Sequence, residues 1–262
     1  MKAVIRSSAL LLFLATLGMG QSVTSYISQI ADGGAWQTTI VIANTSSSNT
    51  FASVNFFQDT TGGNTQSWSL GFQEGSTQNL SLPGGATKFF HTLGTAPVTS
   101  VGWAQVIASG PGVAGLVAYA IFTQRIPGRT DQDGTAPAAA GASRFLVPFN
   151  NTGGFSTALA ITNYGSSGTI SVNIQSDTGV ISHDSFSLPA QGHLAFALAQ
   201  QFPSTAGQRG MVELYMPGSG RDAPALAAIA LLFNPTGAFT TAPVYGHSGT
   251  PIIGVVPPAG AK

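Results

Sequence analysis

The chain of 262 residues contains no cysteine, which excludes disulfide bonds, thiol catalysis, iron–sulfur clusters and cysteine-ligated zinc. Charge is also scarce, because only 7% of the residues are Asp, Glu, Lys or Arg, against about 25% in an average soluble domain. Nine basic and nine acidic residues cancel, so neither a nucleic-acid partner nor disorder driven by net charge is expected. What the chain has is 33 glycines and 43% hydrophobic residues. This composition predicts one large or two ordinary folded domains with a polar, weakly charged surface.

Residues 1–20 have the features of a secretory signal peptide. Lys2 and Arg6 precede an apolar run at residues 9–15, and small residues stand at the −3 and −1 positions before Gln21. The run is too short for a spanning helix, which needs about 20 apolar residues. We therefore expect a secreted, extracellular or cell-surface protein, with the periplasm as a further compartment, and no membrane span after cleavage. Export without cysteine is typical of bacteria.

The rest of the chain contains one sequence pattern twice. Ile30–Asn44 aligns without a gap on Phe149–Asn163, and both stretches contain Gly-Gly-x-(Trp/Phe)-x-Thr followed by an asparagine. Further matches follow in the same order: Ser53–Phe56 with Ser171–Ile174, Ser81–Pro83 with Ser187–Pro189, Val101–Val106 with Arg209–Leu214, Gly115–Phe122 with Leu226–Phe233, and Ala136–Pro137 with Ala242–Pro243. A unit of roughly 110 residues has the size of a domain. The pattern predicts an internal duplication.

Each unit has the pattern of short β-strands. Apolar and polar residues alternate, as in Ile170, Val172 and Ile174, and glycine-rich turns recur every eight to twelve residues or so. Two continuous apolar runs, 115–122 and 225–233, indicate central strands. We therefore expect an all-β protein with two tandem antiparallel, immunoglobulin-like β-sandwich domains. The expected division is a signal peptide at 1–20, a first sandwich at 21–124, a linker at 125–143, a second sandwich at 144–245 and a flexible C-terminal tail at 246–262.

The repeated motifs resemble a known group of proteins. Gly-Gly-x-(Trp/Phe)-x-Thr, then Leu82–Gly85 and Val101–Ala104, are similar to tandem β-sandwich repeats in secreted proteins of environmental bacteria. The similarity spans residues 26–245 and implies an immunoglobulin-like layout, although this chain lacks the cysteine pair of true immunoglobulin domains. The group is functionally uncharacterised, so the resemblance implies fold and export and assigns no catalytic or ligand-binding residue.

The sequence shows no catalytic constellation. The four histidines have no metal-site spacing, and no Gly-x-Ser-x-Gly elbow occurs. We therefore expect a protein that is not an enzyme, with no catalytic residues and no cofactor. Asp131-Gln132-Asp133-Gly134 resembles the opening of a calcium loop but lacks the later ligands, including the distal glutamate. Asp131 and Asp133 are weak metal candidates, and a polar turn is the simpler explanation.

Aromatic residues offer the better candidates for binding. Trp36 and Trp103 align with other apolar residues in the second unit, which predicts core positions. Trp68 has no evident large aromatic counterpart and is the weak candidate for a ligand-binding residue. In a sheet with one wet face, one member of each pair Phe56-Phe57 and Phe89-Phe90 must point outward. The first unit is therefore expected to carry the interaction surface.

Three functions remain after this reasoning. The first is an exported, non-catalytic structural or adhesive protein that acts through its surface or its edge strands, because low charge removes one guard against edge pairing. Its partners would be other extracellular proteins, a second copy of itself, or polysaccharide. The alternative is a carbohydrate-binding module that uses the aromatics of the first unit. The third is a hydrolase whose site the sequence does not reveal.

Overall fold

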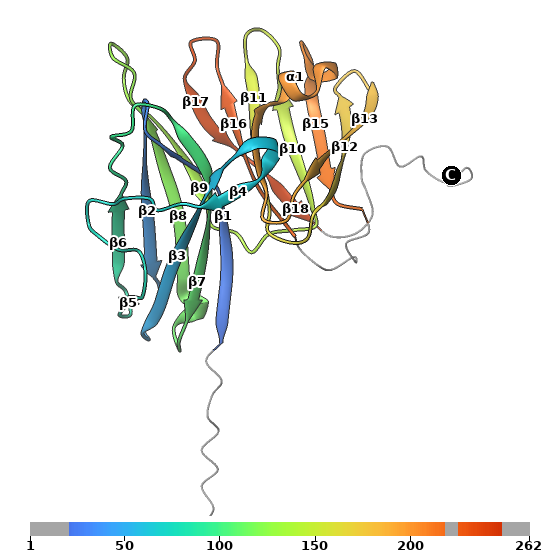
Figure 1. Ribbon diagram of the computed structural model, residues 1–262. Helices are drawn as coiled ribbons and strands as arrows, with labels where there is room; N and C mark the ends of the chain where they lie inside the picture. The colour runs from blue at the N-terminus through green and yellow to red at the C-terminus, as the bar shows by residue number, and fades with distance from the viewer. Residues whose placement is uncertain (1–20, 218–224, 248–262) are drawn as a thin grey trace, which may run out of the picture.

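The computed structural model describes residues 21–217 and 225–247. The predicted signal peptide and residues 248–262 of the predicted tail lie outside this part of the chain. Within it the protein is an all-β structure of antiparallel sheets packed as sandwiches, with one short α-helix (Figure 1). The expected all-β sandwich class is therefore confirmed. No helix in the described ranges has the length and apolar character needed to cross a membrane.

The first sandwich consists of two sheets, which we name A and B. Sheet A contains, in spatial order, β1 (Ser22–Asp32), β7 (Ser100–Ser109), β3 (Thr50–Asp59) and β4 (Thr65–Ser67), with β5 (Leu80–Leu82) also paired to β3. Sheet B contains β6 (Thr87–His91), β2 (Trp36–Asn44), β8 (Leu116–Gln124) and β9 (Gln132–Pro137). Two short helical turns, η1 (Thr61–Gly63) and η2 (Val113–Gly115), join strands of this sandwich.

The second sandwich consists of sheets C and D. Sheet C contains β13 (Ile181–Leu188), β12 (Gly168–Ser176), β15 (Arg209–Tyr215), β10 (Arg144–Asn150) and β18 (Tyr245–His247). Sheet D contains β14 (His193–Ala197), β11 (Ser156–Asn163), β16 (Leu226–Phe233) and β17 (Phe239–Ala242). The helix α1 (Leu198–Gln201) and the turn η3 (Pro203–Thr205) follow β14.

The two sandwiches have the same strand order. The order β1-β7-β3-β4 in sheet A corresponds to β10-β15-β12-β13 in sheet C, and β6-β2-β8-β9 corresponds to β14-β11-β16-β17. The pairing also corrects one detail of the sequence alignment. Asn44 lies opposite Leu116, and Asn163 lies opposite Leu226. Leu116 therefore corresponds to Leu226, one residue away from the alignment of Gly115 with Leu226, because alanine-rich runs do not specify their register by sequence alone.

The repeated motifs build the same local hydrogen bonds in both sandwiches. The buried Nδ2 of Asn44 donates to the carbonyl oxygens of Ser48 (2.7 Å), Leu82 (2.9 Å) and Pro83 (3.2 Å). Asn163 makes the corresponding bonds to Ser166, Leu188 and Pro189. Each asparagine thus satisfies buried carbonyl groups of a turn and of a Leu-Pro step, which removes the cost of leaving them unpaired. These matching motifs serve the fold.

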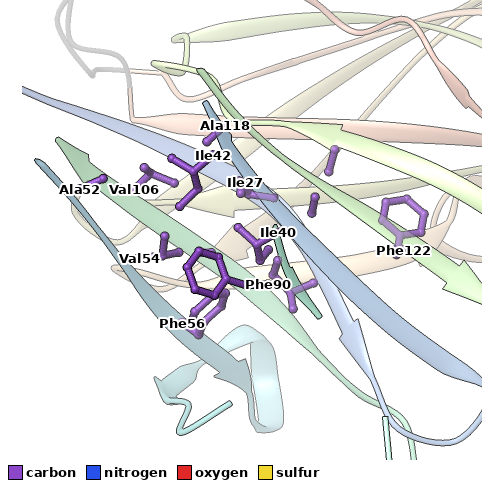
Figure 2. Packing of buried hydrophobic residues seen from close by; sticks show 14 of the residues in the cluster. Ile27, Ile40, Ile42, Ala52, Val54, Phe56, Phe90, Val106, Ala118 and Phe122 are labelled. Atoms are coloured by element: carbon purple, nitrogen blue, oxygen red, sulfur yellow. The ribbon is translucent and has the colours of Figure 1, made fainter. Parts of the chain in front are cut away.

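Each sandwich has a core between its sheets. Figure 2 shows Val54 and Val106 of sheet A with Ile40, Ile42 and Phe90 of sheet B in the first core, and all five are buried. A second core lies between sheets C and D. Ala160 and Ile229 of sheet D, however, belong to the first core cluster. The outer face of sheet D is therefore packed against the first sandwich, and apolar burial extends across the junction.

Specific polar contacts also hold the two sandwiches together. The buried ring of His193 in β14 contacts the carboxylate of Asp59 in β3 through Nδ1 (2.8 Å) and the carbonyl oxygen of Ser28 through Nε2 (2.9 Å). Thr135 and Thr241 join β9 to β17 through two hydrogen bonds of 3.0 and 2.9 Å. The junction combines apolar packing with specific polar contacts.

The range 125–143, expected as a linker, contains a strand. β9 pairs with β8 as the edge of sheet B, with Gly134 and Ala136 on its buried side and Asp133 and Thr135 exposed. The residues after β9 continue across the junction, where Ala139 bridges to Tyr26 of β1. The sequence pattern did not predict β9, because the buried residues of this strand are a glycine and an alanine. Their small side chains give almost no hydrophobic signal. At the other end, β18 includes Gly246 and His247, two residues of the predicted tail.

Candidate functional site

A groove lies beside Trp68 on the first sandwich. Its volume is about 330 Å³, and it runs between β3 and the chain segment 67–78. The backbone N–H of Trp68 donates to the carbonyl oxygen of Phe56 (2.8 Å), and the N–H of Val54 donates to Thr77 (3.1 Å). These two bonds fix the segment along β3 and so set the width of the groove.

The groove combines aromatic and neutral polar walls. Trp68 is half-buried and packs against the core cluster, so its ring is held in place. The ring of Phe57, also half-buried, is stacked on Trp103 with centroids 4.2 Å apart. The remaining walls include exposed serines at positions 67, 69 and 76, and every lining residue in this described region is uncharged.

Amide side chains form a small network beside the groove, which Asn55 and Gln78 line. The Nε2 of Gln78 donates to the carbonyl oxygen of Val54 (2.5 Å) and to Oδ1 of Asn55 (3.4 Å). Asn55 in turn donates to Oε1 of Gln105 at 3.4 Å. Amides carry both donors and acceptors, and the longer of these bonds are weak. The network can therefore exchange bonds with the hydroxyl groups of a neutral ligand.

The corresponding outer face of sheet C carries charge instead. Glu213 of β15 is fully buried, and its carboxylate lies 3.9 Å from Nη1 of Arg144 and 3.5 Å from Nε2 of His247. Asn173 donates to Glu213 Oε2 (3.1 Å) and accepts from Nδ1 of His183 (2.8 Å). A buried carboxylate needs such partners to offset its desolvation. The arrangement compensates Glu213 and ties β10, β12, β13, β15 and β18 together.

The candidate metal ligands have other partners. The carboxylate of Asp131 accepts a hydrogen bond from Nε of Arg125 (3.1 Å), and that of Asp133 accepts one from the Thr123 hydroxyl (2.6 Å). The calcium-loop interpretation requires both to face one ion. Across residues 21–217 and 225–247, no group of three or more His, Asp or Glu side chains converges as a metal site would.

The aromatic pairs lie as the alternation of strands predicts. Phe56 and Phe90 are buried in the core, whereas Phe57 is half-buried and Phe89 is exposed on the outer side. Trp36 is half-buried and packs against Phe122 and Phe239.

Trp103 is buried, but its position differs from the expected one. It lies on the outer face of sheet A, where its Nε1 donates to the carbonyl oxygen of Gln191 (3.2 Å) across the junction. Sequence reasoning found Trp68 from its lack of a counterpart. It missed Asn55, Gln78 and Gln105, because neutral amides on alternating positions look like ordinary solvated strand residues.

Neither of two comparisons with known proteins found a relative of this chain. No protein-family model matches the chain, and no curated protein matches it in sequence.

Proposed function

We propose that this chain is an exported, non-catalytic adhesive protein that binds neutral polysaccharide in the groove beside Trp68. The observation that carries the proposal is a fixed aromatic ring next to an uncharged network of amides and hydroxyls. A sugar ring presents an apolar C–H face and a rim of hydroxyl groups, so it matches one aromatic surface and several neutral donors and acceptors. The signal-peptide features of residues 1–20 support an extracellular encounter with such a ligand.

Rigid joining of the two sandwiches supports adhesion as the role of this binding. The His193–Asp59 contact, the Trp103–Gln191 bond and the shared apolar core hold both sandwiches in one orientation. A rigid body transmits force between a ligand and an attachment point without first extending a linker. The groove and the charged face of sheet C are then presented on fixed sides of one particle.

Edge-strand assembly, the other mode of adhesion, is less well supported. Lys88 of the edge strand β6 lies opposite the buried Ile42, so it is on the inward face of its sheet. Asp184 of the edge strand β13 lies opposite the buried Val172. A charge on the inward face of an edge strand opposes pairing with another sheet, because that pairing would bury the charge.

The proposal is tested with a glycan array followed by titration calorimetry on the best neutral polysaccharide. We expect the wild-type protein to bind, and Trp68→Ala to lose about tenfold or more in affinity, since aromatic stacking contributes most of the contact area. Gln78→Ala, which removes an exposed amide and spares the core, should weaken binding by a smaller factor. Phe155→Ala removes an exposed aromatic of the second sandwich and serves as the matched control. Absence of any bound glycan, or equal affinity of the Trp68 and Phe155 variants, contradicts the proposal.

A further inference from the structure

A second concavity lies at the junction of the sandwiches, away from the groove. It has a volume of about 160 Å³ and is lined from both sides, by Ala31, Trp36 and Phe122 of the first sandwich and by Ala160, Ala195 and Ile229 of the second, among others. Almost all of its wall is apolar, and every lining residue in this described region is uncharged. We propose that this cavity binds a small, uncharged, mainly apolar molecule that carries one hydrogen-bond donor.

The size of the cavity suits a ligand of one ring. An engineered apolar cavity of about 150 Å³ in another protein stays dry and takes up benzene. Native cores are packed with few voids larger than a water molecule, so an apolar space of this size at a junction is unusual. Ligand sites in proteins are often found where two packed units meet.

Gln29 is the residue that provides a hydrogen-bond acceptor at this site. Gln29 is one of the lining residues, and its side-chain Oε1 is buried with no hydrogen-bond partner among the described residues. The Nε2 of the same amide donates to the carbonyl oxygen of Ile30 at 3.4 Å, which assigns the other atom as the acceptor. A buried acceptor without a donor is costly. A ligand hydroxyl or N–H group would remove that cost while its apolar part fills the cavity.

The sequence of small residues on β11 and β14 explains why the cavity exists. Ala158, Ala160 and Ala195 place only methyl groups on the outer face of sheet D, where larger side chains would fill the space. Ala195 is exposed although it lines the cavity, so it lies at the mouth. A bulky residue there closes the entrance without inserting atoms into either core.

Phenol and toluene are suitable probes, because they have nearly the same shape and only phenol carries a donor. Titration followed by ligand-observed NMR and by tryptophan fluorescence should show saturable binding of phenol to the purified protein, with Trp36 as the reporter. We expect Ala195→Phe to lower the affinity for phenol by about tenfold or more, as a blocked entrance removes most of the contact. Ala195→Leu is a smaller replacement that keeps the test valid where Phe perturbs the junction.

Two further variants separate this site from general apolar adsorption. Ala114→Phe places the same aromatic ring at an exposed position in η2 and should leave phenol binding unchanged. Gln29→Leu should lower the affinity for phenol about fivefold, the factor of one neutral hydrogen bond, and leave toluene binding unchanged. The proposal is overturned where phenol binding does not saturate, where Ala195→Phe and Ala114→Phe bind alike, or where Gln29→Leu weakens both probes equally. Glycan binding at Trp68 is a separate readout, and a failure to bind glycan would not contradict the proposal for the junction cavity.

Discussion

The outer faces of sheets A and C are built on the same strand order but carry different chemistry. The matched registers of β3–β7 and β12–β15 place Gln105 where sheet C has Glu213, and Asn55 where it has Asn173. In both sheets the asparagine Nδ2 donates to the neighbouring side chain, at 3.4 Å in sheet A and 3.1 Å in sheet C. The central residue of the pair is therefore an amide in sheet A and a carboxylate in sheet C.

The difference shows what a buried carboxylate requires from its surroundings. Around Glu213 the chain places Arg144 and His247, and the Arg144 guanidinium also lies over the ring of Tyr215, 4.3 Å from its centroid. Around Gln105 the neighbours are uncharged, and Tyr26 lies directly opposite it on β1. The same backbone therefore accommodates either chemistry, provided that the whole neighbourhood changes with the central residue.

Trp103 and Met211 also occupy corresponding positions on the two outer faces, and truncating them gives the largest expected contrast. Trp103→Ala should lower the free energy of unfolding by about 3–5 kcal/mol, because Trp103 is 1% exposed and packs at the junction. Met211→Ala should cost only about 1 kcal/mol, since Met211 is half-buried on a face without a second sandwich. Urea unfolding followed by circular dichroism measures both. Equal losses would mean that Trp103 does not stabilise the junction.

Substitutions at Glu213 and Gln105 test how charge contributes to the difference between the two outer faces. Glu213→Gln should lower the free energy of unfolding by about 2–3 kcal/mol at neutral pH, because Arg144 loses its carboxylate partner in a buried setting. Gln105→Glu should cost about 1–2 kcal/mol, because it places a carboxylate where the neighbouring side chains are uncharged.

The cost of Gln105→Glu should depend on pH. Protonation of the carboxyl introduced at position 105 removes its charge, so the cost should fade as the pH is lowered from about 7 to about 4. Thermal unfolding of the wild type and of Gln105→Glu over this pH range measures the response, and a pH-independent cost would contradict the explanation.

The smallest expected effect concerns Tyr26, which sheet A uses to contact the second sandwich. Its ring is stacked on that of Tyr164 with centroids 3.7 Å apart, and the Tyr164 hydroxyl donates to the carbonyl oxygen of Ala140 (3.1 Å). Burial raises the pKa of both phenols above the ordinary value of 10.0, and for Tyr164 the neighbouring Tyr26 adds to the rise. The folded state then holds these protons more tightly than the unfolded state.

Stability from this pair is therefore fully present below pH about 10 and declines as the pH rises above it. Tyr164→Phe should cost about 1 kcal/mol at neutral pH, through the lost hydrogen bond, and should flatten the decline between pH about 9 and about 11. Tyr245→Phe, at a tyrosine 56% exposed, is the control. Urea midpoints across this pH range measure the slope, and equal slopes for wild type and Tyr164→Phe would refute the role of burial.

Much of the architecture could be predicted from particular residues. Alternation in Ile170, Val172 and Ile174 assigned a strand with one buried face, and all three are buried. The paired motifs around Asn44 and Asn163 matched two positions that make the same turn contacts. Such features are local, because a period of two and a capped turn depend on residues close in sequence. The strand β9 within 125–143 could not be predicted, because it buries Gly134 and Ala136, whose small side chains give no apolar pattern.

The candidate sites could be predicted only in part. Trp68 was visible as an aromatic without a counterpart, but Asn55, Gln78 and Gln105 come from three separate segments whose approach the sequence does not encode locally. The junction cavity was invisible, since Gln29 and Ala195 lie 166 positions apart in the sequence and meet only when the sandwiches pack. The same holds for His193 and Asp59.

The sequence by itself determined that this protein is an all-β chain of low charge and without cysteine, with strands whose apolar faces must be buried. It also determined the turn chemistry that the two sandwiches share. Only the tertiary structure decided which outer face would be covered, which amides would meet beside Trp68, and where an apolar space would remain. The physical reason is the distance along the chain between the residues that each feature requires. Alternation and capping depend on neighbours along the chain, whereas a groove or a junction depends on how surfaces distant in sequence fit together.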